Sequence, residues 1–157
     1  MDYPSDEEEY VIVERVTGPA VNVNTVATTD QLAALQALCR EVYVDPSLVQ
    51  YAVRLVSATR YPDRHGIKDM AGLITFGASP RATIGLVEGA RALAMMRGRA
   101  YALPEDMVDL VPDVLRHRVV LSYEGLSEGL TSDALIARIM KHIPPPARPL
   151  EAEKRVA

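Results

Sequence analysis

A chain of 157 residues, 48% of them hydrophobic, is long enough to bury the core of one domain. Its net charge of −4 argues against a general nucleic-acid binder, and it has no apolar run of the roughly 20 residues that a transmembrane helix needs. The acidic N-terminus shows no signal peptide, and the single cysteine, Cys39, cannot form an internal disulfide. The sequence therefore predicts a cytoplasmic protein without a membrane span.

The N-terminal part of the chain predicts two helices joined by a linker. Ser5-Asp6-Glu7-Glu8 has the residue types and spacing of a capping box, and Thr17-Gly18-Pro19 ends the helix that it begins. Residues 19–27 are rich in β-branched side chains and fit either an extended segment or a linker. A second helix begins at residues 28–31, and its apolar positions recur at helical spacing: Leu32, Leu35 and Leu38.

The middle of the chain predicts two longer helices separated by a loop. The first begins at Asp45 and ends at Tyr61. Residues 61–78 form the longest irregular stretch and are therefore a candidate functional loop. The second helix covers residues 80 to about 97. The buried stripe expected of the first helix contains Leu48, Val49, Ala52, Val53 and Val56.

The C-terminal part predicts two more helices. Pro104 opens one of them, with acidic residues in its first turn, and this helix is interrupted or ends near Pro112. Thr131 caps the last helix, the prolines at 144–146 end it, and the charged tail 147–157 is expected to be disordered. The chain is therefore predicted to be all-α, a small helical bundle with an N-terminal helical or extended arm.

The helix at residues 80–97 begins in an unusual way. Ser79 can cap free backbone N–H groups, and Pro80 fits a first helical turn. Arg81, however, places a cation where the helix dipole disfavours positive charge. No carboxylate in the neighbouring sequence compensates that charge.

At about 100° per residue, Arg81 and Gly85 fall on the side of this helix opposite its apolar stripe. Gly85 is small enough to let another surface come close to Arg81. Helix physics alone favours a solvated arginine here. The alternative is an anion held by Arg81 together with the N–H groups of the helix start. The predicted core-facing residues are Ala82, Thr83, Leu86, Val87, Ala90, Leu93 and Ala94.

Other candidate sites give weaker patterns. The histidines at 65, 117 and 142 are scattered, without a second ligand at a metal-binding spacing, so no metal site is predicted. Asp106 and Asp109 are interpreted as solvated charges on a first turn and an exposed face. The basic cluster Arg116-His117-Arg118 lies near a helix C-terminus, where cations are favourable, so its arginines are expected to hold local carbonyls or a carboxylate.

The sequence carries no complete catalytic site. Ser79 has no His/Asp arrangement near it in the sequence, so it is interpreted as a capping residue and not as a nucleophile. Nothing resembles a phosphate-binding GxxxxGK[ST] loop or a strand that ends in paired acids for Mg²⁺. Any nucleotide chemistry would therefore depend on residues outside this chain.

Several blocks of the sequence, in the right order, resemble the C-terminal lid of MoxR-type AAA+ ATPases. These are "GASPRA" (77–82), "ARALAMMRGRAYALPEDM" (90–107) and "DVLRHRVVLSYEG" (113–125). "DYPSDEEE" (2–9) is similar to the segment where the family's α/β nucleotide-binding core passes into the lid. The resemblance covers roughly residues 2–146, and residues 10–27 depart from it, because they carry no clear nucleotide-contact motif.

The resemblance implies a role for Arg81 that helix physics alone does not favour. Arg81 matches the family's sensor-2 arginine, which the lid aims at the γ-phosphate of ATP in the core, and Ser79 belongs to the same nucleotide-binding segment. The missing counter-charge would then be the nucleotide itself. ATP and Mg²⁺ are cofactors implied for the full-length protein, with neither held tightly by this segment alone. A segment without the core's phosphate loop is expected to be inactive by itself.

The resemblance also implies a domain division and partners. Residues 1–27 would be the end of the AAA+ core and a linker, residues 28–146 the helical lid, and residues 147–157 a disordered tail. The partner of the lid would be the AAA+ core of the same polypeptide, in a ring homo-oligomer, as a hexamer. The family implies chaperone-like remodelling or metal-cofactor insertion, without naming the client protein. Met1 directly before Asp2 suggests an excised piece of a longer protein.

Two alternatives to a lid remain open on the sequence. One is a stand-alone helical protein-interaction module without a nucleotide function. The other is a nucleic-acid binder that would use a set of arginines, and the net acidity and the lack of a recognition-helix pattern weaken it. Those arginines are Arg91, Arg97, Arg99, Arg116 and Arg118.

Overall fold

The computed structural model describes residues 3–20 and 22–147. The chain divides into two compact units, Met1–Ala33 and Ala34–Ala157. Of the tail predicted to be disordered, residues 148–157 lie outside the described residues.

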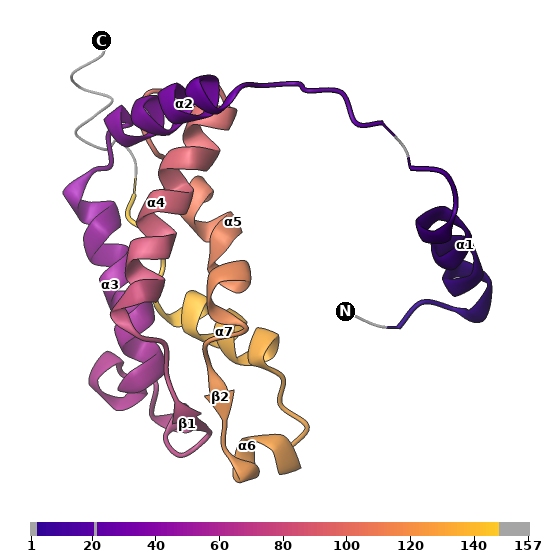
Figure 1. Ribbon diagram of the computed structural model, residues 1–157. Coiled ribbons are helices and arrows are strands. Elements are labelled where there is room, and N and C mark those ends of the chain that lie inside the picture. Colours follow the sequence, from indigo (N-terminus) through magenta and orange to yellow (C-terminus); the bar gives the residue numbers. More distant parts are fainter. Residues whose placement is uncertain (1–2, 21, 148–157) are drawn as a thin grey trace. The chain divides into compact units, whose positions relative to one another are not determined.

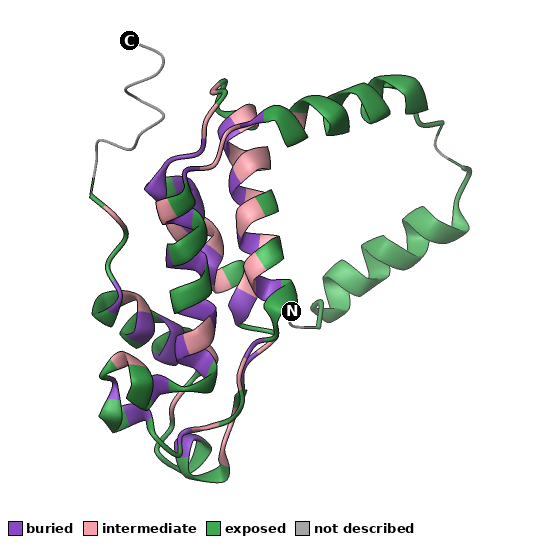
Figure 2. Ribbon diagram, turned by 90° about the vertical axis from the view of Figure 1, so that its left-hand side faces the viewer, coloured by how far each residue is buried: buried purple, intermediate pink, exposed green. Residues whose placement is uncertain are grey.

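The first unit contains helix α1 (Asp6–Thr17) and the start of helix α2 (Thr29–Glu41). The predicted capping box is present, because the Glu8 N–H donates to Ser5 Oγ (3.3 Å) and the Ser5 N–H donates to Glu8 Oε2 (2.9 Å). The Glu8 carboxylate also accepts from the Ser5 hydroxyl (3.2 Å), and the bonds from the Ser5 N–H and then from this hydroxyl lower the pKa of Glu8. No residue of α1 is buried, and Figure 2 shows the helix exposed along its length.

The second unit is a helical bundle. Helices α3 (Pro46–Arg60), α4 (Pro80–Met96) and α5 (Pro104–Leu115) lie side by side, with α4 packed against both others (Figure 1). Helix α7 (Ser132–His142) packs against α5 and α3. The core is aliphatic and includes the fully buried Leu48, Leu55, Val56, Leu86, Met107, Leu115, Leu135, Ile136 and Ile139. The prediction of an all-α bundle is confirmed.

Short elements close the end of the bundle where α3 ends and α4 begins (Figure 1). Two 3₁₀ turns, η1 (Pro62–His65) and η2 (Lys68–Met70), follow α3. Strand β1 (Ile74–Phe76) pairs antiparallel with β2 (Val120–Leu121), and the short helix α6 (Tyr123–Ser127) comes next in the chain. The stretch at 61–78, expected to be irregular, is therefore largely ordered.

Two sequence predictions about individual helices are wrong. Val49 and Val53 are 37% and 48% exposed, because the buried face of α3 runs through Leu48, Ala52, Leu55 and Val56 instead. Helix α5 continues through Pro112 to Leu115. A proline inside a helix costs about 3 kcal/mol, and the burial of Val111 and Leu115 on either side of Pro112 offsets that cost.

Candidate functional site

Helix α4 begins where the sequence predicts, but its first turn is closed differently. Ser79 is the N-cap residue, with an extended backbone (φ −78°, ψ 170°), and Pro80 occupies the first turn. The Ser79 side chain makes no capping hydrogen bond, which corrects the prediction that it caps the helix. The Ala82 N–H, which could have donated to that hydroxyl, donates to the Ser79 carbonyl instead (2.9 Å). The Ser79 hydroxyl is thus left exposed at the helix start.

Arg81 is exposed in the first turn of α4. Among the described residues it makes no hydrogen bond and no ion pair. The opposite face of the helix is buried, as predicted: Ala82, Leu86, Ala90 and Ala94 have no exposed surface, and Thr83, Val87 and Leu93 are half-buried. Arg81 therefore presents an uncompensated positive charge away from the core.

The glycines that follow Arg81 lie against α5. A Cβ atom on Gly85 would lie 3.7 Å from Val114 Cγ1, and one on Gly89 would lie 3.0 Å from Leu110 Cδ1. The surface that comes close to Gly85 is thus α5 of this chain, which corrects the expectation of an open face there. The open surface beside Arg81 is confined to the start of α4.

The segment before Arg81 is fixed to the end of α3. Thr59 is fully buried, and its hydroxyl donates to the Val56 carbonyl (2.7 Å) and accepts from the Ala78 N–H (2.9 Å). Gly77 lies so close to α3 that a Cβ atom there would collide with the Thr59 carbonyl group. The sequence analysis did not predict this contact. The available signal was a threonine in the last turn of one helix together with a glycine shortly before the next helix.

Asp106 is not the solvated charge that the sequence predicts. Its side chain is 0% exposed, and its carboxylate accepts from Arg97 Nη1 (2.8 Å), Arg99 Nη1 (2.7 Å), Arg99 Nη2 (2.5 Å) and the Leu103 N–H (2.7 Å). Burial alone would raise the pKa of Asp106, but the bonds from Arg99, Leu103 and Arg97 hold it below the ordinary value. These contacts join the end of α4 to the start of α5 and make Asp106 a structural residue.

Two further charged candidates, Asp109 and Arg116, also pair within the fold. Asp109 accepts from Arg97 Nη2 (2.7 Å) at the surface. Arg116 contacts Asp113 (3.2 Å) and Asp133 (3.0 Å), which confirms for Arg116 the prediction that it holds a neighbouring carboxylate. For Arg118 the prediction is not confirmed, because its Nε is buried without a hydrogen-bond partner among the described residues. Three of the five arginines considered for nucleic-acid binding, Arg97, Arg99 and Arg116, are therefore already paired with acids.

No metal centre forms within the described part of the chain. His65 Nε2 lies 3.0 Å from Ser57 Oγ, and burial and then the charge of Arg54 lower the pKa of His65. His117 and His142 are exposed on α5's C-terminal side and at the end of α7. Among the described residues, no group of three or more His, Cys, Asp or Glu side chains could hold a metal ion.

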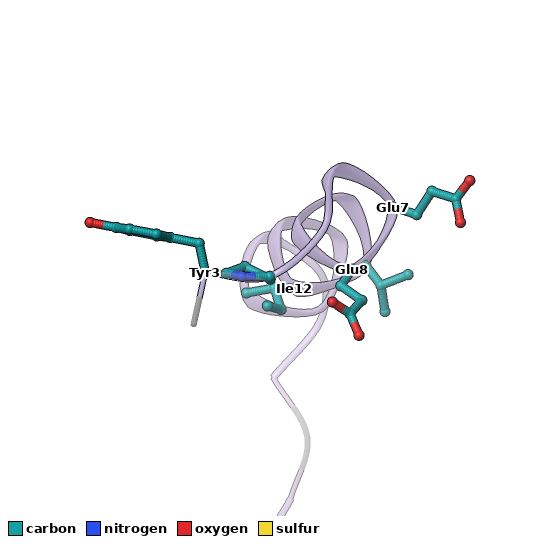
Figure 3. Close-up of a pocket in the computed structure, with 6 residues that line it drawn as sticks. Tyr3, Glu7, Glu8 and Ile12 are labelled. Carbon is teal, nitrogen blue, oxygen red and sulfur yellow. The ribbon is translucent and has the colours of Figure 1, made fainter. Parts of the chain in front are cut away.

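A depression on α1 in the first unit contains none of the predicted site residues. It is lined by Tyr3, Pro4, Glu7, Glu8, Val11 and Ile12. Figure 3 shows Tyr3, Glu7 and Glu8 pointing away from one another, so their polar atoms do not converge on a ligand. The first turn of α4, with Arg81, is the stronger candidate site.

Comparison with known proteins assigns the class of this fold. Residues 67–139 match the family of the AAA lid domain, and this range contains β1, α4, α5 and most of α7. A crystal structure of a candidate ATPase from Cytophaga hutchinsonii is 32% identical and aligns with a TM-score of 0.78, over 94% of this chain and 45% of that one. The second unit is thus an AAA lid domain.

Longer bacterial proteins identify the family. The chain is 40% identical over 141 residues to the protein named Chaperone MoxR1 of Mycobacterium tuberculosis, and the aligned region covers 90% of this chain and 37% of that protein. It is 39% identical over 111 residues to Protein MoxR of Paracoccus denitrificans, covering 67% of this chain and 32% of that protein. The chain belongs to the MoxR-type AAA+ proteins and spans between 32% and 37% of the length of these two relatives.

Proposed function

We propose that this chain is the C-terminal lid of a MoxR-type AAA+ ATPase, in which Arg81 acts as the sensor-2 arginine. The observation that carries the proposal is the uncompensated charge of Arg81, exposed at the first turn of α4 within the AAA lid match. A nucleotide γ-phosphate, bound by the core of the same polypeptide, would supply the missing counter-charge. Ser79, exposed at the N-cap, is the second proposed nucleotide contact.

The chemistry of Arg81 suits this role. A guanidinium stays charged and presents a planar fork of donors to phosphate oxygens. Placed at the transferring phosphoryl group, it stabilises the negative charge that spreads over the equatorial oxygens. Because the arginine is carried by the lid, its contact with the γ-phosphate also links nucleotide state to the position of the lid.

The rest of the proposed assembly follows from the family. Residues 1–27 would complete the core and the linker, and residues 28–146 would form the lid. The core would bind ATP and Mg²⁺ and assemble as a cytoplasmic ring, in hexameric form, that remodels a client protein or helps insert a metal cofactor. No described helix of this chain is long and apolar enough to cross a membrane.

The test is Arg81→Ala in the polypeptide that carries this lid behind a nucleotide-binding core. Turnover should fall by roughly 10²–10³, the usual effect of losing one preorganised donor to developing charge. Arg81→Lys should recover only part of the loss, because an ammonium lacks the bidentate fork. The unfolding free energy of the lid should stay within a few tenths of a kcal/mol, since a cation leaves an unfavourable dipole position.

Arg138→Ala is the matched control. Arg138 is an exposed arginine on α7, a helix that does not carry the proposed site. Turnover should be unchanged in this variant. If Arg81→Ala and Arg138→Ala have equal turnover, or if Arg81→Ala loses activity only in proportion to folded protein, Arg81 is not a nucleotide contact.

A further inference from the structure

The start of α4 is held by a buried threonine on a different helix. Thr59 lies in the last turn of α3 and has no exposed surface. Its hydroxyl uses both of its hydrogen-bonding roles, since it donates to the Val56 carbonyl (2.7 Å) and accepts from the Ala78 N–H (2.9 Å). The second bond crosses from α3 to the residue that stands three positions before Arg81.

Gly77 makes this close contact possible. A Cβ atom on Gly77 would lie 2.6 Å from the Thr59 carbonyl carbon and 2.7 Å from Arg60 Cγ. Both distances are shorter than real Cβ contacts, and the first involves backbone, which cannot swing away as a flexible side chain does. Only glycine lets the chain before α4 approach α3 this closely.

From Ala78 to Arg81 the backbone has little freedom. The Ala78 N–H is anchored on Thr59, Ser79 is extended, and the ring of Pro80 fixes its φ near the helical value. The Ala82 N–H then closes the first turn on the Ser79 carbonyl (2.9 Å). The position of the Arg81 backbone is thus determined by the end of α3.

We infer that Thr59 is a positioning residue, which acts through Arg81 by anchoring the start of α4 on the end of α3. The inference rests on the proposed role of Arg81 at the nucleotide. A displacement of about 1 Å at a catalytic group can cost up to 10²-fold in rate, so an anchor three residues away matters for turnover. Thr59 itself would touch no nucleotide.

The first experiment tests the anchor in this chain alone. Thr59→Val keeps the shape of the side chain and removes the hydroxyl, so amide hydrogen exchange should accelerate at Ala78 and in the first turn of α4. Thr59→Ser should restore the slow exchange, because serine keeps the hydroxyl. Unchanged exchange at Ala78 in Thr59→Val would overturn the inference.

Thr131→Val is the matched control. It makes the same chemical change at another hydroxyl that accepts a backbone N–H, that of Ala134 (3.1 Å), at the start of α7. Exchange should then accelerate at Ala134 and stay unchanged at Ala78.

The second experiment tests the coupling to Arg81 in the polypeptide that also carries the nucleotide-binding core. Thr59→Val should lower kcat about tenfold, Thr59→Ser should recover most of it, and Thr131→Val should leave it unchanged. In an Arg81→Ala background, Thr59→Val should have no additional effect, because the residue it positions is gone.

The outcomes separate the two proposals. If Arg81→Ala does not change turnover, the proposed function fails. If Arg81→Ala lowers turnover, the positioning role of Thr59 can still fail by itself. It fails if Thr59→Val has the same kcat as the control Thr131→Val, or if Thr59→Val lowers kcat by the same factor with Arg81 and with Ala at position 81. Gly77→Ala provides a second route to a displacement of the α4 start with the hydroxyl intact, and it should lower kcat per folded protein only when Arg81 is present.

Discussion

Asp106 lies in the first turn of α5 with no exposed side-chain surface, and four N–H donors surround its carboxylate. Arg81 lies in the first turn of α4, exposed and without a partner among the described residues. Both are charges near a helix start, where only the negative one suits the dipole. Asp106, whose negative charge is favourable at a helix start, stabilises the fold. Arg81, whose positive charge is unfavourable there, is available to bind a ligand.

Removing the charge of Asp106 should destabilise the lid strongly. Asp106→Asn leaves Arg97 and Arg99 without their shared carboxylate, and breaking a buried pair of this kind costs about 3 kcal/mol. Asp109→Asn is the control, because the Asp109 side chain is 51% exposed. Its ion pair with Arg97 should therefore contribute less than about 1 kcal/mol to the unfolding free energy. Urea unfolding of both variants measures the difference. Equal losses would mean that the buried network is not the stabilising feature.

The pH dependence of stability should follow from the same carboxylate. The pKa of Asp106 is lower in the folded chain than in the unfolded one, so its stabilisation is fully present above the unfolded value, about 3.9. As the pH falls below that value and through the lower folded pKa, the stabilisation is lost. The urea midpoint should therefore drop with acidification, and the drop should be smaller in Asp106→Asn. A drop of the same size in both proteins would assign the acid sensitivity to other groups.

The start of α5 shows what residue patterns can and cannot predict. The sequence places Asp106 in a first helical turn correctly, but the arginines that bury it stand 9 and 7 positions earlier in the chain. They reach it because Gly98 adopts a left-handed backbone (φ 72°), which turns the chain between α4 and α5. The sequence signal that could have predicted this network is the run Arg97, Gly98 and Arg99 shortly before an acidic first helical turn.

At the scale of elements, the existence and type of the longer helices could be predicted, while the short helix α6 was missed and the buried faces of the helices could not always be predicted. The capping boxes at Ser5 and Thr28 mark real helix starts, the second through bonds between Thr28 and Gln31 (2.8 and 3.2 Å). The leucines of α2 follow helical spacing but are 47% to 54% exposed, and no residue of α2 is buried. Periodicity reports an apolar face and does not report whether another element covers it.

The packing of α4 on α5 yields a prediction of its own. At Gly85 a Cβ atom would make an ordinary contact with Val114, so Gly85→Ala should gain helix propensity without a clash. We expect the unfolding free energy to rise by about 0.5–1 kcal/mol. Gly77→Ala is the opposite case, because its Cβ atom would meet the backbone of Thr59, and it should destabilise the lid. Thermal unfolding checks both signs, and a loss of stability in Gly85→Ala would contradict this packing of α4 on α5.

At the scale of the whole molecule, the two units differ in how their structure is maintained. The second unit buries a continuous aliphatic core through α3, α4, α5 and α7. Helix α1 of the first unit buries nothing, and an isolated helix of 12 residues is marginal in water. The sequence could predict the helix from its capping box, and the structure adds that none of the residues of α1 is buried.

This contrast determines how the chain should behave by itself. The second unit should unfold in one cooperative transition, with α1 contributing helical signal that melts gradually and separately. ATP turnover should be absent, because the sequence contains no phosphate-binding loop, so nothing would hold a nucleotide against Arg81. Circular dichroism against calorimetry separates the two melting processes, and a coupled phosphate-release assay measures turnover. The contrary result would be steady turnover that survives repurification and disappears in Arg81→Ala. It would mean that the chain itself holds a catalytic site and that Arg81 is part of that site.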